Sequence, residues 1–447
     1  MRLHIQDDDR IYTFLLPVVK RATRRGFHRF HVSGWEKVPR DGSVIFVTNH
    51  TCSLMDPLVM LRAEGKKVVF MARADMFRRP AVASILRWLR ILPIYRIRDG
   101  VSAVKSNDKA IAEAVGVLRD RCPLCLYPEG THRPKHSLLP LGKGVFHIAL
   151  EAVQEIGDAW PVYIVPAGIE YSDYFRYRPD VELQIGEPIN VNEVIRETTA
   201  NYSSLTDHLQ PRIMNDLRER LTLAMRPLFT WIPDDDDYEA MFELTKLSAA
   251  RQEDVSTLGH RRDFNQAVIG KLMAWRNDEP EAARKTFADA LQFRKERERA
   301  RVSVFSTRLA HTFTSPIRRI SFFILHYLLP TLLALIILPV WLACSLLTLP
   351  GWLPAELLAS RAKDAAWRNT RRFGVFFIAK PLLTVLVAVF SFLFLTWPAA
   401  TFLTLLFFLN IPTEITYDGA EYFRRLISDW RWLFHPTLRR LYDRLSL

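Results

Sequence analysis

Residues 44–57 read VIFVTNHTCSLMDP and contain the pattern that decides the fold of the N-terminal part of the chain. The apolar run 44–47 has the length of a buried strand, and the polar residues after it indicate a turn. Pro57 favours the first position of a helix, and Asp56 is suited to cap it. The stretch therefore predicts a strand, a loop and a helix in succession, with His50 and Asp56 in the loop.

Short apolar runs of this kind alternate with helical patterns from residue 43 to residue 190. Helical spacing is clearest where Ile111, Ala114, Val115 and Leu118 fall on one face. The expected strands are 44–47, 68–71, 93–95, 124–127, 164–167 and 181–185. Strands that alternate with helices predict an α/β fold, in which a mixed or mostly parallel sheet is flanked by helices.

The first chemical pattern is the pair His50 and Asp56, which are six positions apart. The two side chains can meet only if the chain between them is a loop that folds back. In that geometry the Asp carboxylate fixes the tautomer of the imidazole, and the other ring nitrogen can take a proton from an alcohol. The alternative is that the pair has only a structural role, as a His near an Asp often does.

Two further stretches follow expected strands and carry polar groups. Residues 126–131 read LYPEGT and are followed by basic residues that include Arg133; residues 93–98 read PIYRIR. Gly130 allows a ligand to approach the backbone, Thr131 offers a hydroxyl group, and the nearby cations suit a phosphate. The alternative for each stretch is a charged loop after a buried strand.

Taken in order, these stretches resemble the glycerolipid acyltransferases of the lysophosphatidate and glycerol-3-phosphate type. That family has Asn-His with a downstream Asp, then a strand-end Arg, then Phe-Pro-Glu-Gly-Thr-Arg, then a Val-Pro strand. The matching residues here are Asn49, His50 and Asp56, then Arg96, then Tyr127 to Thr131, then Val165 and Pro166. The resemblance covers residues 30–190.

The resemblance implies an O-acyltransferase in which His50 is the catalytic base and Asp56 is its partner. The residues that it implies for substrate binding are Asn49, Arg96, Glu129, Gly130, Thr131 and Arg133. Two departures concern the acceptor. Five residues separate His50 from Asp56 instead of the usual four, which is the spacing of a variant subgroup (HX5D). His132 stands where the family has an Arg, and Arg133 comes next.

We therefore expect transfer of a fatty acyl group from acyl-CoA or acyl carrier protein to the hydroxyl of lysophosphatidate, in phospholipid synthesis. A glycerol-3-phosphate 1-acyltransferase and a phospholipid-remodelling transacylase are the alternatives. From other classes, a catalytically inactive lipid-binding module and a membrane-tethered nucleic-acid binder are weaker candidates. The acyl donor is a co-substrate, and we expect no metal or bound cofactor; the oligomeric state stays open.

The charge balance favours an anionic partner. Lys and Arg number 61 against 48 Asp and Glu, which gives a net charge of +13. Both nucleic acid and an anionic membrane fit this charge. No nucleic-acid-binding motif appears, so we expect a phospholipid membrane and no nucleic acid. Residues 1–32 predict an amphipathic helix that ends in a basic cluster; it either binds lipid or packs on the domain.

The composition changes along the chain and suggests five parts. The expected ranges are 1–32 for the amphipathic helix, 33–194 for the α/β acyltransferase domain, 195–315 for a helical appendage, 316–415 for a membrane-embedded region and 416–447 for a basic amphipathic segment. In the last segment, Trp430 and Trp432 read as anchors at a membrane interface.

Residues 320–349 and 381–413 contain no Asp, Glu, Lys or Arg, and each exceeds the ~20 residues of a membrane span. The connection between them carries six basic residues and should stay in the cytoplasm, as should the catalytic domain. Two helical hairpins, with turns near Pro339 and near Trp397-Pro398, satisfy this rule. Two ordinary tilted spans are the alternative.

Overall fold

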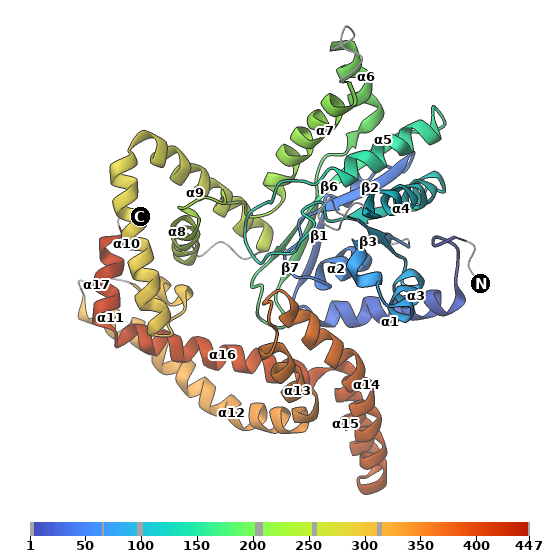
Figure 1. Cartoon of the computed structure of the whole chain (residues 1–447). Helices are drawn as coiled ribbons and strands as arrows, with labels where there is room; N and C mark the ends of the chain where they lie inside the picture. The colour runs from blue at the N-terminus through green and yellow to red at the C-terminus, as the bar shows by residue number, and fades with distance from the viewer. Residues whose placement is uncertain are drawn as a thin grey trace. The chain divides into compact units, whose positions relative to one another are not determined.

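The computed structural model describes residues 4–64, 67–95, 102–201, 209–252, 257–310 and 315–445 (Figure 1). The chain divides into two compact units. Unit 1 comprises Met1–Trp231 together with Asp364–Thr370. Unit 2 comprises Ile232–Lys363 and Arg371–Leu447. A short stretch that lies between two C-terminal helices along the chain therefore belongs to the N-terminal unit.

Unit 1 is built on an eight-stranded sheet with the order β1-β7-β6-β2-β5-β3-β4, in which β8 pairs with β6. Neighbouring strands are parallel, except that β6 is antiparallel to β7 and to β8. The strands are β1 (Phe30–Ser33), β2 (Ser43–Thr48), β3 (Val69–Arg73), β4 (Ile91–Ile94), β5 (Leu124–Leu126), β6 (Val162–Tyr171), β7 (Val181–Ile185) and β8 (Ile189–Asn190). The expected mixed, mostly parallel sheet is confirmed.

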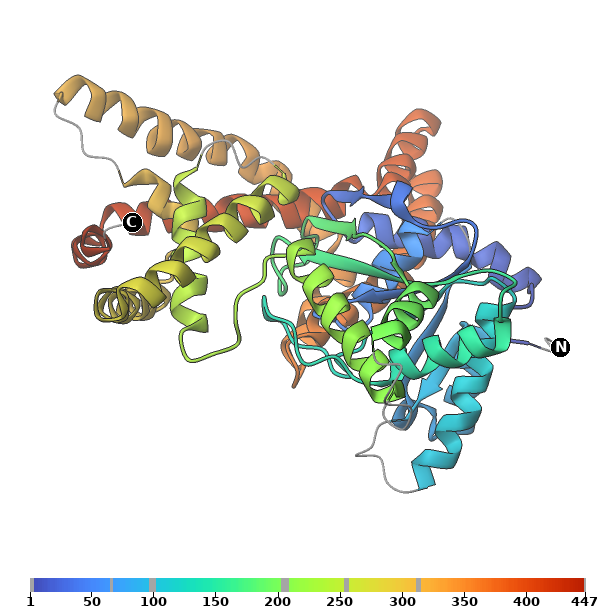
Figure 2. The ribbon, with the colours of Figure 1, turned by 90° about the horizontal axis from the view of Figure 1, so that it is seen from above.

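Helices cover both faces of this sheet. On one face lie α1 and α2, and on the other lie α4 and α5, followed by α6 and α7; Figure 2 shows the sheet between the two groups. The helices of unit 1 are α1 (Arg10–Arg25), α2 (Met55–Ala63), α3 (Pro80–Trp88), α4 (Ser102–Arg119), α5 (Gly144–Ile156), α6 (Val191–Asn201) and α7 (Leu209–Met225). Apolar residues such as Ile45, Phe146 and Leu217 are fully buried in one core. Because α7 supplies Leu217 to it, the expected boundary at 194 falls inside unit 1.

Unit 2 is helical throughout its described residues and has a core of its own. Leu244, Phe293, Trp432 and Tyr442 are buried there, so Trp432 packs inside the protein and is not a membrane anchor as the sequence suggests. The helices are α8 (Tyr238–Arg251), α9 (Leu258–Asp278), α10 (Pro280–Arg299), α11 (Pro316–Phe323), α12 (Leu329–Leu347), α13 (Leu349–Ser360), α14 (Trp367–Phe394), α15 (Trp397–Leu409), α16 (Ile411–Leu433) and α17 (Pro436–Arg444). The first four residues of α14 belong to unit 1.

Among the residues that the structure describes, two helices are long and apolar enough to cross a membrane, namely Pro316–Leu347, which runs from α11 to α12, and Trp367–Phe394. The expected turn near Pro339 is wrong, because α12 continues through Pro339. Proline removes one backbone hydrogen bond, but apolar helices tolerate this loss when neighbouring groups satisfy the backbone. The expected break near Trp397 is present, since α14 ends at Phe394 and α15 begins at Trp397. The pair α15 and α16, bent by 57°, is a third candidate span.

Candidate active site

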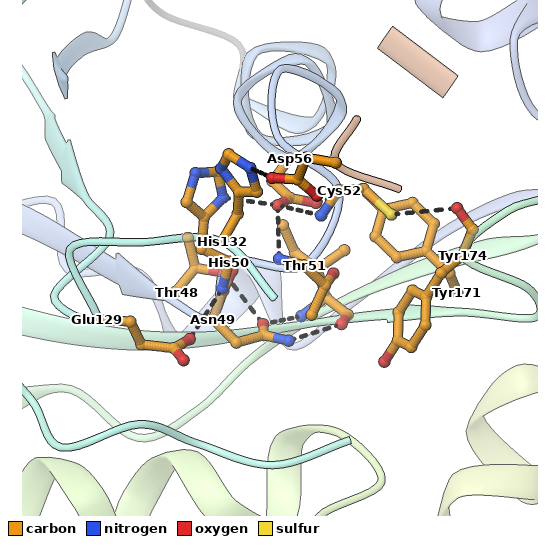
Figure 3. Close-up of polar contacts among 12 residues, drawn as sticks. Thr48, Asn49, His50, Thr51, Cys52, Asp56, Glu129, His132, Tyr171 and Tyr174 are labelled. Atoms are coloured by element: carbon orange, nitrogen blue, oxygen red, sulfur yellow. Dashed lines mark hydrogen bonds and ion pairs between the residues drawn. The ribbon is translucent and has the colours of Figure 1, made fainter. Parts of the chain in front are cut away.

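The site lies at one edge of the sheet, where two neighbouring strands end. β2 and β5 are parallel, with Val47 opposite Leu126, so the segments that follow them leave the sheet at the same edge. Two hydrogen bonds join these segments: the Arg133 amide donates to the His50 carbonyl oxygen at 3.0 Å, and the His50 amide donates to Oε1 of Glu129 at 3.0 Å. The first and second sequence patterns are thus brought together, as Figure 3 shows.

His50 and Asp56 are in direct contact. Nδ1 of His50 lies 2.7 Å from Oδ2 of Asp56, which is fully buried. The same Oδ2 accepts the backbone N–H groups of Thr51 and Cys52, each at 2.9 Å, and Oδ1 accepts the Tyr171 hydroxyl at 2.7 Å. These donors offset the cost of burying the carboxylate. Since Nδ1 is held by Asp56, Nε2 is the nitrogen of His50 that can take a proton.

The helix after this loop begins earlier than the sequence predicts. α2 starts at Met55, so Asp56 lies in its first turn and not ahead of it, and Pro57 is the third residue. Leu54 occupies the cap position without a side-chain hydrogen bond. The Asp56 carboxylate instead turns back to the loop amides, and this is what closes the loop around His50.

Two rings contact the His50 imidazole. The Tyr127 ring lies 4.3 Å from it, centroid to centroid, at an angle of 30°. The His132 ring lies 5.4 Å away and nearly perpendicular, at 87°. His50 is therefore confined by a carboxylate at Nδ1 and by two aromatic neighbours, which restricts rotation of its ring.

Glu129 is held by backbone groups on both oxygens. Oε1 accepts the His50 amide at 3.0 Å, and Oε2 accepts the Leu139 amide at 3.1 Å. Burial raises the pKa of the Glu129 carboxyl to about 7, although these two amides act in the opposite direction. In this position Glu129 ties the loop that carries His50 to the segment around Leu139.

The other residues implied for substrate binding occupy different settings. Asn49 is buried; its Nδ2 donates to the Ile169 carbonyl at 3.0 Å, and its Oδ1 accepts the Ile169 amide at 2.7 Å, so it joins the loop to β6. Gly130 has φ of 64°, a conformation that favours glycine. Thr131 is half-buried beside it, and an Arg133 Nη donates to Ser137 Oγ at 2.7 Å. Arg96 lies outside the described residues.

Three contacts of the site have no signal in the local sequence. Tyr171 comes from the end of β6, 115 positions after Asp56. His132 is visible in the sequence only as a departure from the family pattern, and its contact with His50 is not. Asp364 accepts a hydrogen bond from His132 across 232 positions. Only the fold brings these residues together.

The cysteine in the loop does not offer a nucleophile. Cys52 is buried, its Sγ donates to the Tyr174 carbonyl at 3.8 Å, and burial raises the pKa of its thiol well above the usual range. In the part of the chain that the structure describes, no three His, Cys, Asp or Glu residues are grouped as metal ligands. The chemically available group is Nε2 of His50.

Comparison with known proteins shows a family likeness over the N-terminal part of the chain. Residues 29–170 match the family model Acyltransferase. Over these residues the chain is therefore similar to the glycerolipid acyltransferases, as its motifs predict.

Two relatives illustrate this likeness. The 1-acyl-sn-glycerol-3-phosphate acyltransferase of Borreliella burgdorferi is 27% identical over 120 residues, which cover 27% of this chain and 46% of that protein. The chain thus matches less than half the length of this curated relative. The crystal structure of the 1-acyl-sn-glycerophosphate acyltransferase of Thermotoga maritima is 23% identical and covers 48% of this chain and 83% of that one, with a TM-score of 0.32.

Proposed function

We propose that the protein transfers a fatty acyl group from an acyl thioester, acyl-CoA or acyl carrier protein, to the free hydroxyl of lysophosphatidate. The observation that carries the proposal is the contact of 2.7 Å between His50 and the fully buried Asp56. This contact leaves Nε2 of His50 available at the edge of the sheet, where the segments that follow β2 and β5 meet. The name of the Borreliella burgdorferi relative, a 1-acyl-sn-glycerol-3-phosphate acyltransferase, supports lysophosphatidate as the acceptor.

In the proposed reaction, Nε2 of His50 takes the proton from the acceptor hydroxyl as the oxygen attacks the thioester carbonyl. A C–O bond forms and the C–S bond breaks, and the proton passes from His50 to the leaving thiolate. Asp56 keeps the imidazole oriented and stabilises its cationic form. No metal or bound cofactor takes part in this proposal.

The acceptor phosphate would meet Arg96, Gly130, Thr131 and Arg133, the residues that the family pattern implies. Glu129 and Asn49 were implied with them, but their polar atoms contact backbone groups. We therefore propose that Asn49 and Glu129 hold the loops of the site in place and do not contact the phosphate.

The acceptor is tested with the purified full chain in detergent micelles, labelled acyl-CoA, and either lysophosphatidate or glycerol-3-phosphate. Labelled phosphatidate from lysophosphatidate is expected. Product from glycerol-3-phosphate alone would make the protein a glycerol-3-phosphate acyltransferase. Acyl transfer from a labelled phospholipid without acyl-CoA would make it a transacylase. No transfer under any of these conditions would sink the proposal.

We also propose that the protein is membrane-bound with its catalytic domain in the cytoplasm. The two apolar helices support membrane association, and so does α1, where Ile11, Phe14 and Val18 are exposed on a helix that ends in basic residues. The basic connection between the apolar helices favours the cytoplasmic side. If so, a cysteine at the exposed position Ser360 should react with a membrane-impermeant reagent only from that side, in a variant that lacks the four native cysteines. Labelling from outside intact cells would contradict this orientation.

A further inference from the structure

The segment Asp364–Thr370 follows the first apolar helix along the chain and includes the first four residues of the second, yet it belongs to the compact unit that holds the active site. Oδ2 of Asp364 is 2.7 Å from Nε2 of His132. The Trp367 ring lies 5.9 Å from the His132 ring, centroid to centroid, at 76°. Both residues thus contact the imidazole that lies directly against His50.

A second set of contacts fixes the same segment to the loop after β6. Nδ2 of Asn369, which is buried, donates to the Tyr174 carbonyl oxygen at 3.0 Å. The Arg368 guanidinium lies 5.6 Å from the centre of the Phe175 ring. The Tyr174 carbonyl also accepts the Cys52 thiol of the catalytic loop. The segment is therefore attached both to His132 and to the loop after β6.

The hydrogen bond from His132 to Asp364 has a consequence for His50. A carboxylate on one ring nitrogen of a histidine fixes its tautomer and the direction of its ring. His132 held in this way stays perpendicular to His50, at 5.4 Å. His50 is then held by Asp56 at Nδ1 and by the rings of Tyr127 and His132. If His132 moves away, the His50 ring loses one of these contacts and can turn.

We propose that Asp364 is a positioning residue of the active site, which acts through His132 on the orientation of His50, and that the site is incomplete without Asp364–Thr370. This inference rests on the proposed acyltransferase function. Because four residues of the segment form the first turn of α14, the start of an apolar helix contributes contacts to the catalytic site.

The Asp364 side chain also contacts the backbone, and the test must separate this contact from the one with His132. Its Oδ1 accepts the Ala366 amide at 3.0 Å, in the turn that precedes α14. Ser can form the same kind of turn but is too short to reach His132, whereas Asn can make both contacts, with its Oδ1 accepting the Ala366 amide and its Nδ2 donating to His132. Asp364→Ser and Asp364→Asn are therefore the informative variants. A matched control is Asp180→Ser, which breaks the contact of 2.8 Å between His28 and Asp180 elsewhere in unit 1.

For acyl transfer to lysophosphatidate, Asp364→Ser should lower kcat about 10-fold and leave both KM values within about 2-fold, since a misplaced catalytic group costs rate and not binding. Asp364→Asn and Asp180→Ser should stay near the wild-type rate. In a His132→Ala background, Asp364→Ser should have no further effect. Wild-type kcat in Asp364→Ser, a rise in acceptor KM alone, or additive effects of the two substitutions would overturn the inference.

Amide hydrogen exchange of residues 129–137 gives a readout that does not depend on activity. It should be faster in Asp364→Ser than in the wild type and in Asp180→Ser, because the His132 loop loses its attachment. Unchanged exchange would contradict the proposed attachment. An inactive wild-type protein would instead refute the proposed function, and faster exchange in the variant would still establish the contact.

Discussion

Strand β2 in unit 1 and helix α12 in unit 2 are made of the same kinds of apolar residue but have opposite surroundings. Every residue of β2 is buried by the protein itself. Of the most apolar window of Pro316–Leu347 only 11% is buried, and of that of Trp367–Phe394 only 6%. Exposing so much apolar surface to water would cost about 25 cal/mol per Å². The protein interior is the apolar environment of the first region, and a lipid bilayer is the one that we propose for the second.

Catalysis and the proposed membrane attachment therefore depend on apolar residues in different ways. The buried strand β2 fixes the start of the loop that carries His50. Substitutions of the residues that pack around it should therefore change the activity or the free energy of unfolding. The exposed helices have few internal contacts to lose. The predictions below probe this contrast, beginning with the largest expected effect.

Asp56→Asn should lower kcat for acyl transfer by about 10²–10⁴-fold, since the imidazole loses the carboxylate that orients it and stabilises its charge. Membrane attachment should not change. Steady-state kinetics and sedimentation with membranes measure the two properties. The control Asp180→Asn alters another His–Asp contact of unit 1, at 2.8 Å, and should keep full activity. Equal activity of both variants would remove Asp56 from the mechanism.

Leu217→Ala and Leu335→Ala compare one apolar side chain in the two environments. Leu217 of α7 is fully buried in unit 1, and truncation should lower the free energy of unfolding by about 2–5 kcal/mol. Leu335 of α12 is 61% exposed, and its truncation should change that free energy by less than about 0.5 kcal/mol. Both free energies are measured by denaturant unfolding in micelles, with the protease resistance of unit 1 as the readout. A small loss for Leu217→Ala would place α7 outside the core.

The stability of the protein should depend on pH through the buried carboxyl group of Glu129. Burial raises the pKa of Glu129 from 4.5 to about 7, so the native state keeps this proton at pH values where the unfolded chain has lost it. The contribution of Glu129 to the free energy of unfolding is therefore fully present below about pH 4.5 and is lost as the pH rises through 7. A pKa rise of that size amounts to about 3 kcal/mol.

Glu129→Gln has no such proton to lose, so the stability of the wild type relative to this variant should fall between pH 4.5 and pH 8. Denaturant midpoints across this range measure the difference. A difference that does not depend on pH would show that the carboxyl titrates alike in the native and unfolded states.

The sheet could be predicted because each buried strand is a local apolar run. The expected strand at 181–185 coincides with β7, and the others lie within a few residues of β2 to β6. The contact between His50 and Asp56 could also be predicted, since residues 44–57 contain the strand end, both side chains and the helix start. Only the first residue of α2 was misplaced, by two positions.

Long-range contacts could not be predicted. Nothing in the sequence near residue 132 indicates that Asp364 contacts His132, and nothing near Asp56 points to Tyr171. The continuous helix through Pro339 was also missed, because proline breaks helices in water but is tolerated in apolar helices. Trp432 reads as an interface residue by composition, whereas packing in unit 2 buries it. In each case tertiary packing overrides the local signal.

The central claim is that the His50–Asp56 pair performs acyl transfer to lysophosphatidate. The most direct test is the initial rate of labelled phosphatidate formation by the purified full chain and by His50→Ala, with circular dichroism and thermal unfolding as checks of the fold. The account predicts activity in the wild type and a loss of about 10²–10⁴-fold in a folded His50→Ala protein. A well-folded His50→Ala variant that forms phosphatidate at the wild-type rate would contradict it.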